Sequence, residues 1–256
     1  MIKFFRKIRQ KMLTENKFSK YLIYAIGEII LVVIGILIAL QINNQNEYRK
    51  EKAEEIKMLE NFKTTIKGDF NEVSGFSKTF DETDRAIYYL LKHMEGNLEY
   101  NDSLKTHFRQ TTALFSPKID QEVFATLSST DLNIISNDNL KNEIISYYSF
   151  AKRAFDVRIN RYANIMEDAS KNIFSSRFNE LWGNTWDDPH YIDNLQHKTM
   201  TPKNYEELKK DEEYLFFLKS LKNQLYWYVR RPLKQATEKS ERVLQLINDE
   251  LETLKE

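Results

Sequence analysis

The sequence predicts an all-α protein in which an N-terminal transmembrane helix is followed by a long antiparallel bundle of about four helices. Three observations lead to this fold class. Residues 21–42 form one apolar run, apolar residues recur every three or four positions through most of the remaining chain, and the 256 residues include only six glycines and four prolines. β-Rich folds need turn residues about every 8–12 positions, so this scarcity favours long helices.

The apolar run at residues 21–42 is 22 residues long and carries one charged side chain, Glu28. As a helix it spans about 33 Å, which is enough to cross a hydrocarbon core of about 30 Å. A core helix of a soluble protein is usually shorter and has a polar stripe. A cleaved signal peptide has an apolar region of roughly 7–15 residues followed by small residues at the cleavage site, and this run has neither property. We therefore expect an uncleaved membrane anchor.

The charges that flank the run predict its orientation. Residues 1–20 contain seven basic side chains and one acidic side chain, whereas the charges that follow the run are mixed. Basic residues near the ends of a membrane helix stay on the cytoplasmic side. The chain therefore divides into a basic cytoplasmic tail (1–20), a transmembrane helix (21–42) and an exported helical-bundle domain (43–256). Apolar residues at helical spacing in residues 2–13 predict that the tail is an interfacial amphipathic helix, with a disordered basic tail as the alternative.

The charged residues and the absence of cysteine restrict the classes of partner and of chemistry that the exported domain can have. Residues 1–42 carry seven basic and two acidic side chains, which leaves 31 basic and 36 acidic side chains for residues 43–256. A net-acidic domain argues against nucleic acid as a partner, because phosphate binding needs a concentrated basic surface. The basic tail suits an anionic lipid bilayer. The absence of cysteine excludes disulfides, a thiolate nucleophile and cysteine metal ligands.

The apolar periodicity predicts individual helices in residues 43–256. The segments that we expect to be helical are 47–95, 103–115, 120–129, 138–181 and 205–256, and the first of them is compatible with a helix that continues from the membrane span. Gly96-Asn97 should end the first of these, and Ser136 or Asn137 should cap the fourth. Pro232 should kink the last, because proline removes one backbone hydrogen bond. Residues 182–204 are the longest irregular stretch. An up-and-down bundle buries the apolar stripes of such helices.

Two segments carry a resemblance to a known family. The opening IKFFRKIRQKMLTENKFSKYLIYAIGEIILVVIGILIALQINN and the later FATLSSTDLNIISNDNLKNEIISYYSF resemble a family of uncharacterised single-pass membrane proteins from Gram-negative bacteria. Thr130-Asp131 stands where glycine is more usual in the family. The resemblance implies an exported helical domain of unknown function, with no catalytic residue carried over. In such a cell the chain is predicted to cross the inner membrane once, with its C-terminal domain in the periplasm.

The membrane span contains the candidate functional residues. Glu28 is a carboxylate within an apolar run, which is costly and is by default a functional hypothesis, although it lies near the cytoplasmic end. A face with small residues at four-residue spacing suits close helix packing. Its members are Gly27, Leu31, Gly35 and Ala39. These residues predict a homo-oligomer or a protein partner within the membrane, and such faces also occur by chance.

Other candidates for chemistry are weaker. Asp187, Asp188, His190 and His197 have side chains that can ligate metals, but they are too close in sequence to form a site alone, and a solvated turn is the simpler interpretation. His93 and His107 are expected to be surface or hydrogen-bonded residues. No phosphate-binding loop, nucleophile elbow, zinc-protease or dinucleotide motif occurs. We therefore predict no catalytic, metal or cofactor site.

The sequence favours a membrane-anchored interaction or sensing module whose partner is a protein. A structural tether or envelope assembly factor is the alternative, and an enzyme with an unrecognised site is less favoured. A tether should tolerate substitutions in residues 182–204 but not a shortened helix, and a binding module should show the reverse.

Overall fold

The all-α prediction is confirmed. The computed structural model describes residues 18–120, 124–125, 131–181 and 199–256. Within these residues the regular structure is helical, apart from an isolated antiparallel bridge between Phe178 and Pro202. The chain forms two compact units, residues 1–56 and 57–256, and helix α2 (Phe18–Glu95) contributes to both. The tail helix predicted at residues 2–13 lies outside the described residues.

The described part of the first unit is the N-terminal part of α2. Its apolar side chains from Ile26 to Ile42 are exposed all round the helix, and none of its most apolar window is buried within the protein. By length and composition, α2 is the one helix in the described part of the chain that qualifies as a membrane span. Soluble proteins rarely expose an apolar surface of this extent. The helix is therefore compatible with membrane anchoring.

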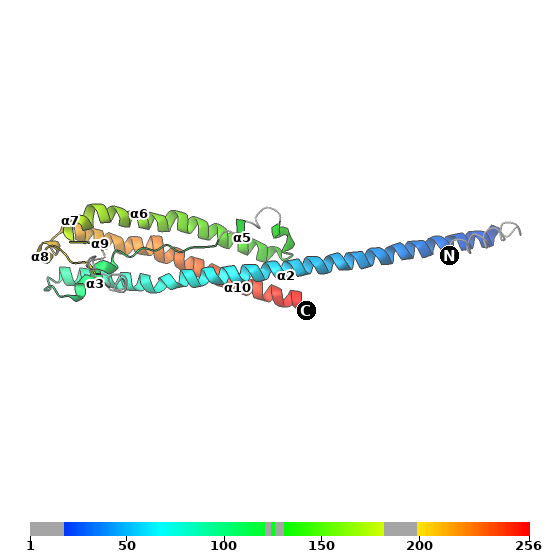
Figure 1. Ribbon diagram of the computed structural model, residues 1–256, viewed down its shortest axis with the longest axis horizontal. Coiled ribbons are helices and arrows are strands. Elements are labelled where there is room, and N and C mark those ends of the chain that lie inside the picture. The colour runs from blue at the N-terminus through cyan, green and yellow to red at the C-terminus, as the bar shows by residue number, and fades with distance from the viewer. Residues whose placement is uncertain (1–17, 121–123, 126–130, 182–198) are drawn as a thin grey trace, which may run out of the picture. The chain divides into compact units, whose positions relative to one another are not determined.

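The second unit is built from four passages of chain (Figure 1). The first is α2 from residue 57 onward. The second runs through α3 (Ser103–Gln110), residues 111–120 and the short η1 (Asp131–Ile134). The third consists of α5 (Asp138–Arg153), η2 (Ala154–Ile159), α6 (Asn160–Ala169), η3 (Ser170–Phe174) and α7 (Ser175–Arg177). The fourth consists of α8 (Tyr205–Leu208), α9 (Glu212–Leu225), η5 (Tyr226–Arg230) and α10 (Arg231–Lys255).

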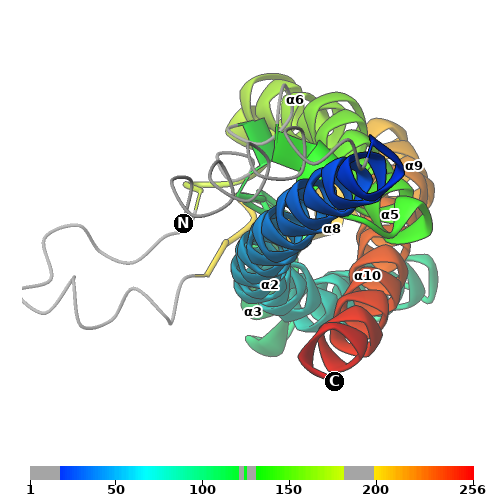
Figure 2. The ribbon, with the colours of Figure 1, turned by 90° about the vertical axis from the view of Figure 1, so that its right-hand side faces the viewer.

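Polar contacts show the directions of these passages. Gln110 donates to Thr83 over 3.2 Å and the backbone N–H of Asp120 donates to Asp69 over 3.0 Å, so the second passage runs antiparallel to α2. Lys219 pairs with Glu95 at 2.7 Å and Lys255 pairs with Glu60 at 2.9 Å, so the fourth passage also opposes α2. The third passage opposes the fourth, because Glu143 pairs with Arg242 at 2.9 Å and Arg177 pairs with Asp211 at 2.7 Å. Figure 2 looks along these rods.

The core of the second unit is rich in aromatic side chains contributed by all four passages. Its largest fully buried side chains include four tyrosines and four phenylalanines: Tyr147, Tyr148, Tyr162, Tyr214, Phe62, Phe108, Phe115 and Phe174. Many of these rings meet edge to face, as Phe115 and Tyr162 do at 5.7 Å. Such geometry adds roughly 0.5–1.5 kcal/mol per pair beyond the area that is buried.

Several predicted helix boundaries match the structure, and two differ. α2 ends before Gly96, and Asn97 adopts the left-handed conformation (φ 50°) that favours glycine or asparagine. Asn137 caps α5 by accepting from the N–H of Leu140 at 3.1 Å. However, α3 ends at Gln110 and not near residue 115. Directly after Gln110, the hydroxyls of Thr111 and Thr112 donate to carbonyl groups of the preceding turn. The last helix is also interrupted after α8, and it restarts at Glu212 with Asp211 as its cap.

Candidate functional site

Two π-helical segments, η2 and η5, lie in contact on the second unit. A π-helical turn takes more residues than an α-helical turn, so it changes the direction of the side chains around it. Pro232 lies two residues after the end of η5, in the first turn of α10, and proline has no N–H to donate to the preceding turn. The chain thus has a π-helical segment just before Pro232, where the sequence predicts a kink. η2 contains neither proline nor glycine.

A cavity of about 350 Å³ opens where these segments meet. Three stretches of the chain line it: η2, the end of α9 with η5, and the start of α10. The lining residues are Arg158, Asn223, Gln224, Trp227, Tyr228 and Arg231. We call this cavity the arginine–tryptophan pocket. It combines guanidinium groups, side-chain amides and aromatic rings, which are groups that orient a ligand and cover its apolar parts.

Aromatic rings hold two of the nearby guanidinium groups in place. The guanidinium carbon of Arg231 lies 5.1 Å from the ring centroid of Trp227, and that of Arg161 lies 5.3 Å from the ring centroid of Tyr228. Tyr226 meets Trp227 edge to face at 5.3 Å. A guanidinium group stacked on a ring keeps its N–H edges available for an anion. The ring of Trp227 is 52% exposed, so this edge of the pocket is accessible to a partner.

The pocket lies in a positively charged part of an otherwise acidic domain. Within the described part of the chain, no carboxylate forms an ion pair with Arg158, Arg161 or Arg231. Residues 214–237 contain five basic side chains and no acidic one, and residues 157–166 contain two basic side chains and no acidic one. Adjacent unneutralised charges of one sign raise the local concentration of counter-charged ligands. The pocket is therefore suited to an anionic group.

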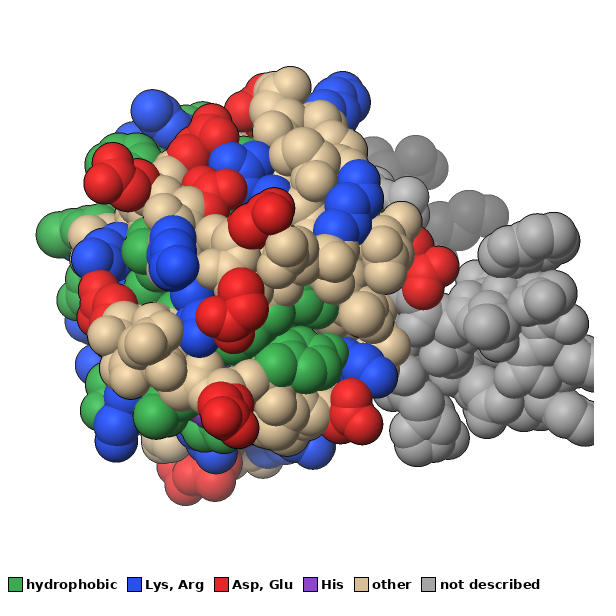
Figure 3. Space-filling view, turned by 90° about the vertical axis from the view of Figure 1, so that its left-hand side faces the viewer, with side chains coloured by type: hydrophobic (Ala, Val, Ile, Leu, Met, Phe, Trp, Pro, Cys, Tyr) green, Lys and Arg blue, Asp and Glu red, His purple; other side chains and the backbone are tan. Residues whose placement is uncertain are grey.

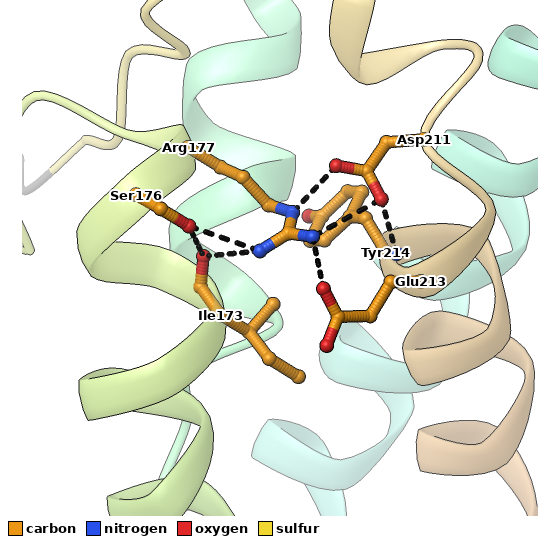
Figure 4. A network of polar contacts seen from close by, with 6 residues as sticks. All are labelled: Ile173, Ser176, Arg177, Asp211, Glu213 and Tyr214. Carbon is orange, nitrogen blue, oxygen red and sulfur yellow. Dashed lines mark hydrogen bonds and ion pairs between the residues drawn. The ribbon is translucent and has the colours of Figure 1, made fainter.

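Arg177 shows the contrasting case of an arginine that is already neutralised (Figure 4). Its Nε donates to Asp211 over 2.7 Å, its Nη2 bonds to both Asp211 and Glu213, and its Nη1 bonds to the carbonyl of Ile173. The hydrogen bond from Arg177 holds the pKa of Asp211 below its ordinary value. This network joins α7 to the start of α9. The nearby end of the unit shows acidic and basic side chains interspersed (Figure 3).

The residues predicted within the membrane span lie on α2 in the first unit. Gly27 and Gly35 have open space where a Cβ would be, Leu31 is 69% exposed, and Ala39 is exposed. Glu28 is half-buried. No other described element covers this face, so it is free to pack against another helix. Its role in association stays a prediction.

The histidines considered from sequence occupy structural positions. His93 is 8% exposed, and one ring nitrogen lies 2.6 Å from the carbonyl oxygen of Glu99. His107 packs on Tyr89 with ring centroids 4.4 Å apart, and burial lowers its pKa. Among the described residues, no three His, Asp or Glu side chains gather where they could hold a metal ion. Asp187, Asp188, His190 and His197 lie outside the described residues.

The family match found in the comparison with known proteins covers part of α2. Residues 28–94, about a quarter of the chain, match the model of a family of unknown function (DUF6090). No curated protein and no solved structure matches the chain. The match supports the resemblance to an uncharacterised domain family. The arginine–tryptophan pocket lies outside the matched segment.

The sequence pattern predicts a functional surface in the membrane span and does not point to the arginine–tryptophan pocket. The signal that was available is the run of 24 residues without an acidic side chain at 214–237, in a domain where acidic residues outnumber basic ones. The motif Trp227-Tyr228-Val229-Arg230-Arg231 lies in this run. The contribution of Arg158 had no local signal, because it depends on the packing of η2 against η5.

Proposed function

We propose that the protein is a single-pass, membrane-anchored interaction module whose helical domain binds a partner protein through the arginine–tryptophan pocket and the aromatic surface beside it. The observation that carries this proposal is the group of arginines at this pocket that form no ion pair within the described part of the chain, two of which stack on the rings of Trp227 and Tyr228. Arginine, tryptophan and tyrosine are the residue types that dominate the energetics of protein interfaces.

An exposed phenylalanine on α9 adds apolar surface on the same face of the helix as the pocket. Phe216 is 71% exposed and precedes Asn223 by seven residues and Trp227 by eleven, so the three share a face of this helical rod. On η2, Val157 is 61% exposed beside Arg158. When a partner covers large apolar side chains that are exposed to water, the free energy falls by about 25 cal/mol per Å² of apolar surface. This surface gives a partner protein both apolar area and charge.

The proposed topology follows from the span and its flanking charges. The tail of residues 1–20 remains in the cytoplasm, residues 21–42 cross the inner membrane, and the domain faces the periplasm. The long apolar helix near the N-terminus supports this arrangement. The anchor keeps the binding surface attached to the membrane, where a partner is recruited.

Photo-crosslinking in the native membrane tests the proposal. A benzoylphenylalanine in place of Phe216 should form crosslinks to one defined protein, and Trp227→Ala should reduce their yield at least fivefold. The same probe in place of Tyr88, which is 57% exposed on α2, serves as the matched control and should not crosslink to that protein. Equal crosslinking from both positions, or an adduct that is unaffected by Trp227→Ala, would show that this surface is not the docking site.

A further inference from the structure

We infer that the arginine–tryptophan pocket receives the carboxylate of an acidic peptide segment of the partner protein, an inference that rests on the proposed docking function. The pocket offers Arg158 and Arg231 from two different helical rods. A guanidinium group is planar and presents paired N–H donors that match the two oxygens of a carboxylate. Two such groups in the lining of one cavity favour a ligand with at least one full negative charge.

The other residues that line the pocket are suited to the methylene groups of an acidic side chain and to the peptide groups beside it. Asn223 and Gln224 supply amide donors and acceptors, which are suited to the peptide groups next to the carboxylate. Trp227 and Tyr228 supply flat apolar surfaces for the methylene groups of glutamate. The volume of about 350 Å³ lies at the small end of ligand clefts, which run from about 300 to 1,000 Å³. The pocket therefore suits one or two side chains of a peptide.

The charge of the surrounding domain favours a short acidic segment over an extended polyanion. Residues 43–256 carry 36 acidic and 31 basic side chains, so a nucleic acid or an anionic bilayer would meet net repulsion away from the pocket. A short segment contacts only the basic region formed by 157–166 and 214–237. Complementary charge of this kind steers association and selects partners.

Trp227 provides a local readout of binding to the full-length chain. The protein has three tryptophans, and Trp182→Phe with Trp186→Phe leaves Trp227 as the single one. This chain, reconstituted in lipid nanodiscs, is titrated with a ten-residue peptide that contains four glutamates among glycine and leucine. We expect the peptide to change the emission of Trp227. The same peptide with glutamine in place of glutamate should bind at least tenfold more weakly.

Substitutions in the pocket test the assignment of the arginines. Arg158→Gln and Arg231→Gln should each weaken the glutamate peptide about tenfold, which corresponds to about 1.4 kcal/mol. Arg231→Lys should weaken it severalfold, because lysine keeps the charge but lacks the planar fork. Arg242→Gln is the matched control, since Arg242 is exposed and already pairs with Glu143 at 2.9 Å. Circular dichroism verifies that each variant is folded.

Three results would overturn the inference. These are equal affinity for the glutamate and glutamine peptides, unchanged affinity in both arginine-to-glutamine variants, and a phosphoserine peptide or phosphatidylglycerol vesicles bound more than tenfold tighter than the glutamate peptide. Any of these three results refutes only the binding of an acidic segment if the crosslink at position 216 still depends on Trp227, because the docking function then stands. Loss of that crosslink together with glutamate-specific peptide binding would instead refute the docking function alone.

Discussion

The hydroxyl of Tyr147 donates a hydrogen bond of 3.0 Å to the carboxylate of Asp69, which is 4% exposed. The other carboxylate oxygen of Asp69 accepts the backbone N–H of Asp120 at 3.0 Å. One buried acidic side chain thus joins three of the four passages of the second unit. Burial raises the pKa of Asp69 to about 6, against the opposing effect of these two hydrogen bonds.

The stability of the second unit should depend on pH through Asp69. Because its pKa rises from 3.8 to about 6 on folding, the folded state holds the proton more tightly than the unfolded state. The resulting stabilisation is fully present below about pH 4 and is lost as the pH rises through about 6, with a total on the order of 2–3 kcal/mol. Asp69→Asn should remove this slope. Urea unfolding from pH 4 to 7.5 measures it, and parallel curves for the two proteins would contradict the prediction.

Two buried tyrosines should respond oppositely to loss of the hydroxyl. Tyr147→Phe removes the donor to Asp69 and should lower the free energy of unfolding by about 1–2 kcal/mol. The hydroxyl of Tyr162 is buried and has no hydrogen-bond partner among the described groups, so Tyr162→Phe should be neutral or stabilising. Urea denaturation of both variants at pH 7 compares them directly. A larger loss from Tyr162→Phe would refute this account of the core.

The Arg177 network should stabilise the junction between α7 and α9. The side chain of Arg177 is 13% exposed, and its replacement by glutamine should cost about 2–3 kcal/mol because Asp211 keeps a partly buried charge. Asp211→Asn should cost less, since asparagine still caps α9 through the N–H of Tyr214. Lys171→Gln is the control. It removes an exposed pair with Glu167 and should leave the free energy of unfolding unchanged within the error of the measurement.

The apolar part of α2 should hold the protein in the membrane. Replacing Val32 and Val33 by arginine places two charges near the centre of the run, where each costs about 2.5–3.5 kcal/mol. The variant should shift from the membrane fraction to the soluble fraction after alkaline extraction. Tyr48→Arg, outside the run, should remain in the membrane. Full membrane retention of the double variant would contradict the anchor.

Self-association within the membrane should depend on the small-residue face of α2. Gly35→Leu fills open space on that face and should weaken association at least fivefold, because it keeps the neighbouring backbone at a distance. Glu28→Leu tests the carboxylate in the same assay. Energy transfer between labelled chains in vesicles measures both effects. Unchanged transfer in both variants would remove this face and Glu28 from any role in association.

The helical rods were predictable because their apolar residues repeat at the spacing of an α-helix over many turns. The stop at Gly96 and Asn97 and the cap at Asn137 were also predictable, since their chemistry is local. The second passage was harder to predict. Residues 111–120 run back along α2 without helix, and they are held there by Asp69 and Glu72, which are more than 40 residues away in sequence. A local pattern does not contain such contacts.

The arginine–tryptophan pocket could not be predicted from the sequence alone, for a similar reason. Pro232 marks η5 through its missing N–H, whereas η2 and η3 have no proline or glycine to mark them. The pocket depends on the juxtaposition of η2 with η5, so Arg158 was indistinguishable from any other solvent-facing arginine.

The bridge between Phe178 and Pro202 also identifies a place where the chain can be engineered. The N–H of Asn179 donates to the carbonyl of Thr201 at 3.1 Å, and the N–H of Lys203 donates to the carbonyl of Arg177 at 2.9 Å. Hydrogen bonds between Arg177, Asn179, Thr201 and Lys203 therefore hold the two ends of the intervening segment next to each other. Since the entropy of closing a loop grows only slowly with its length, a reporter domain inserted between these ends should leave the helical bundle folded.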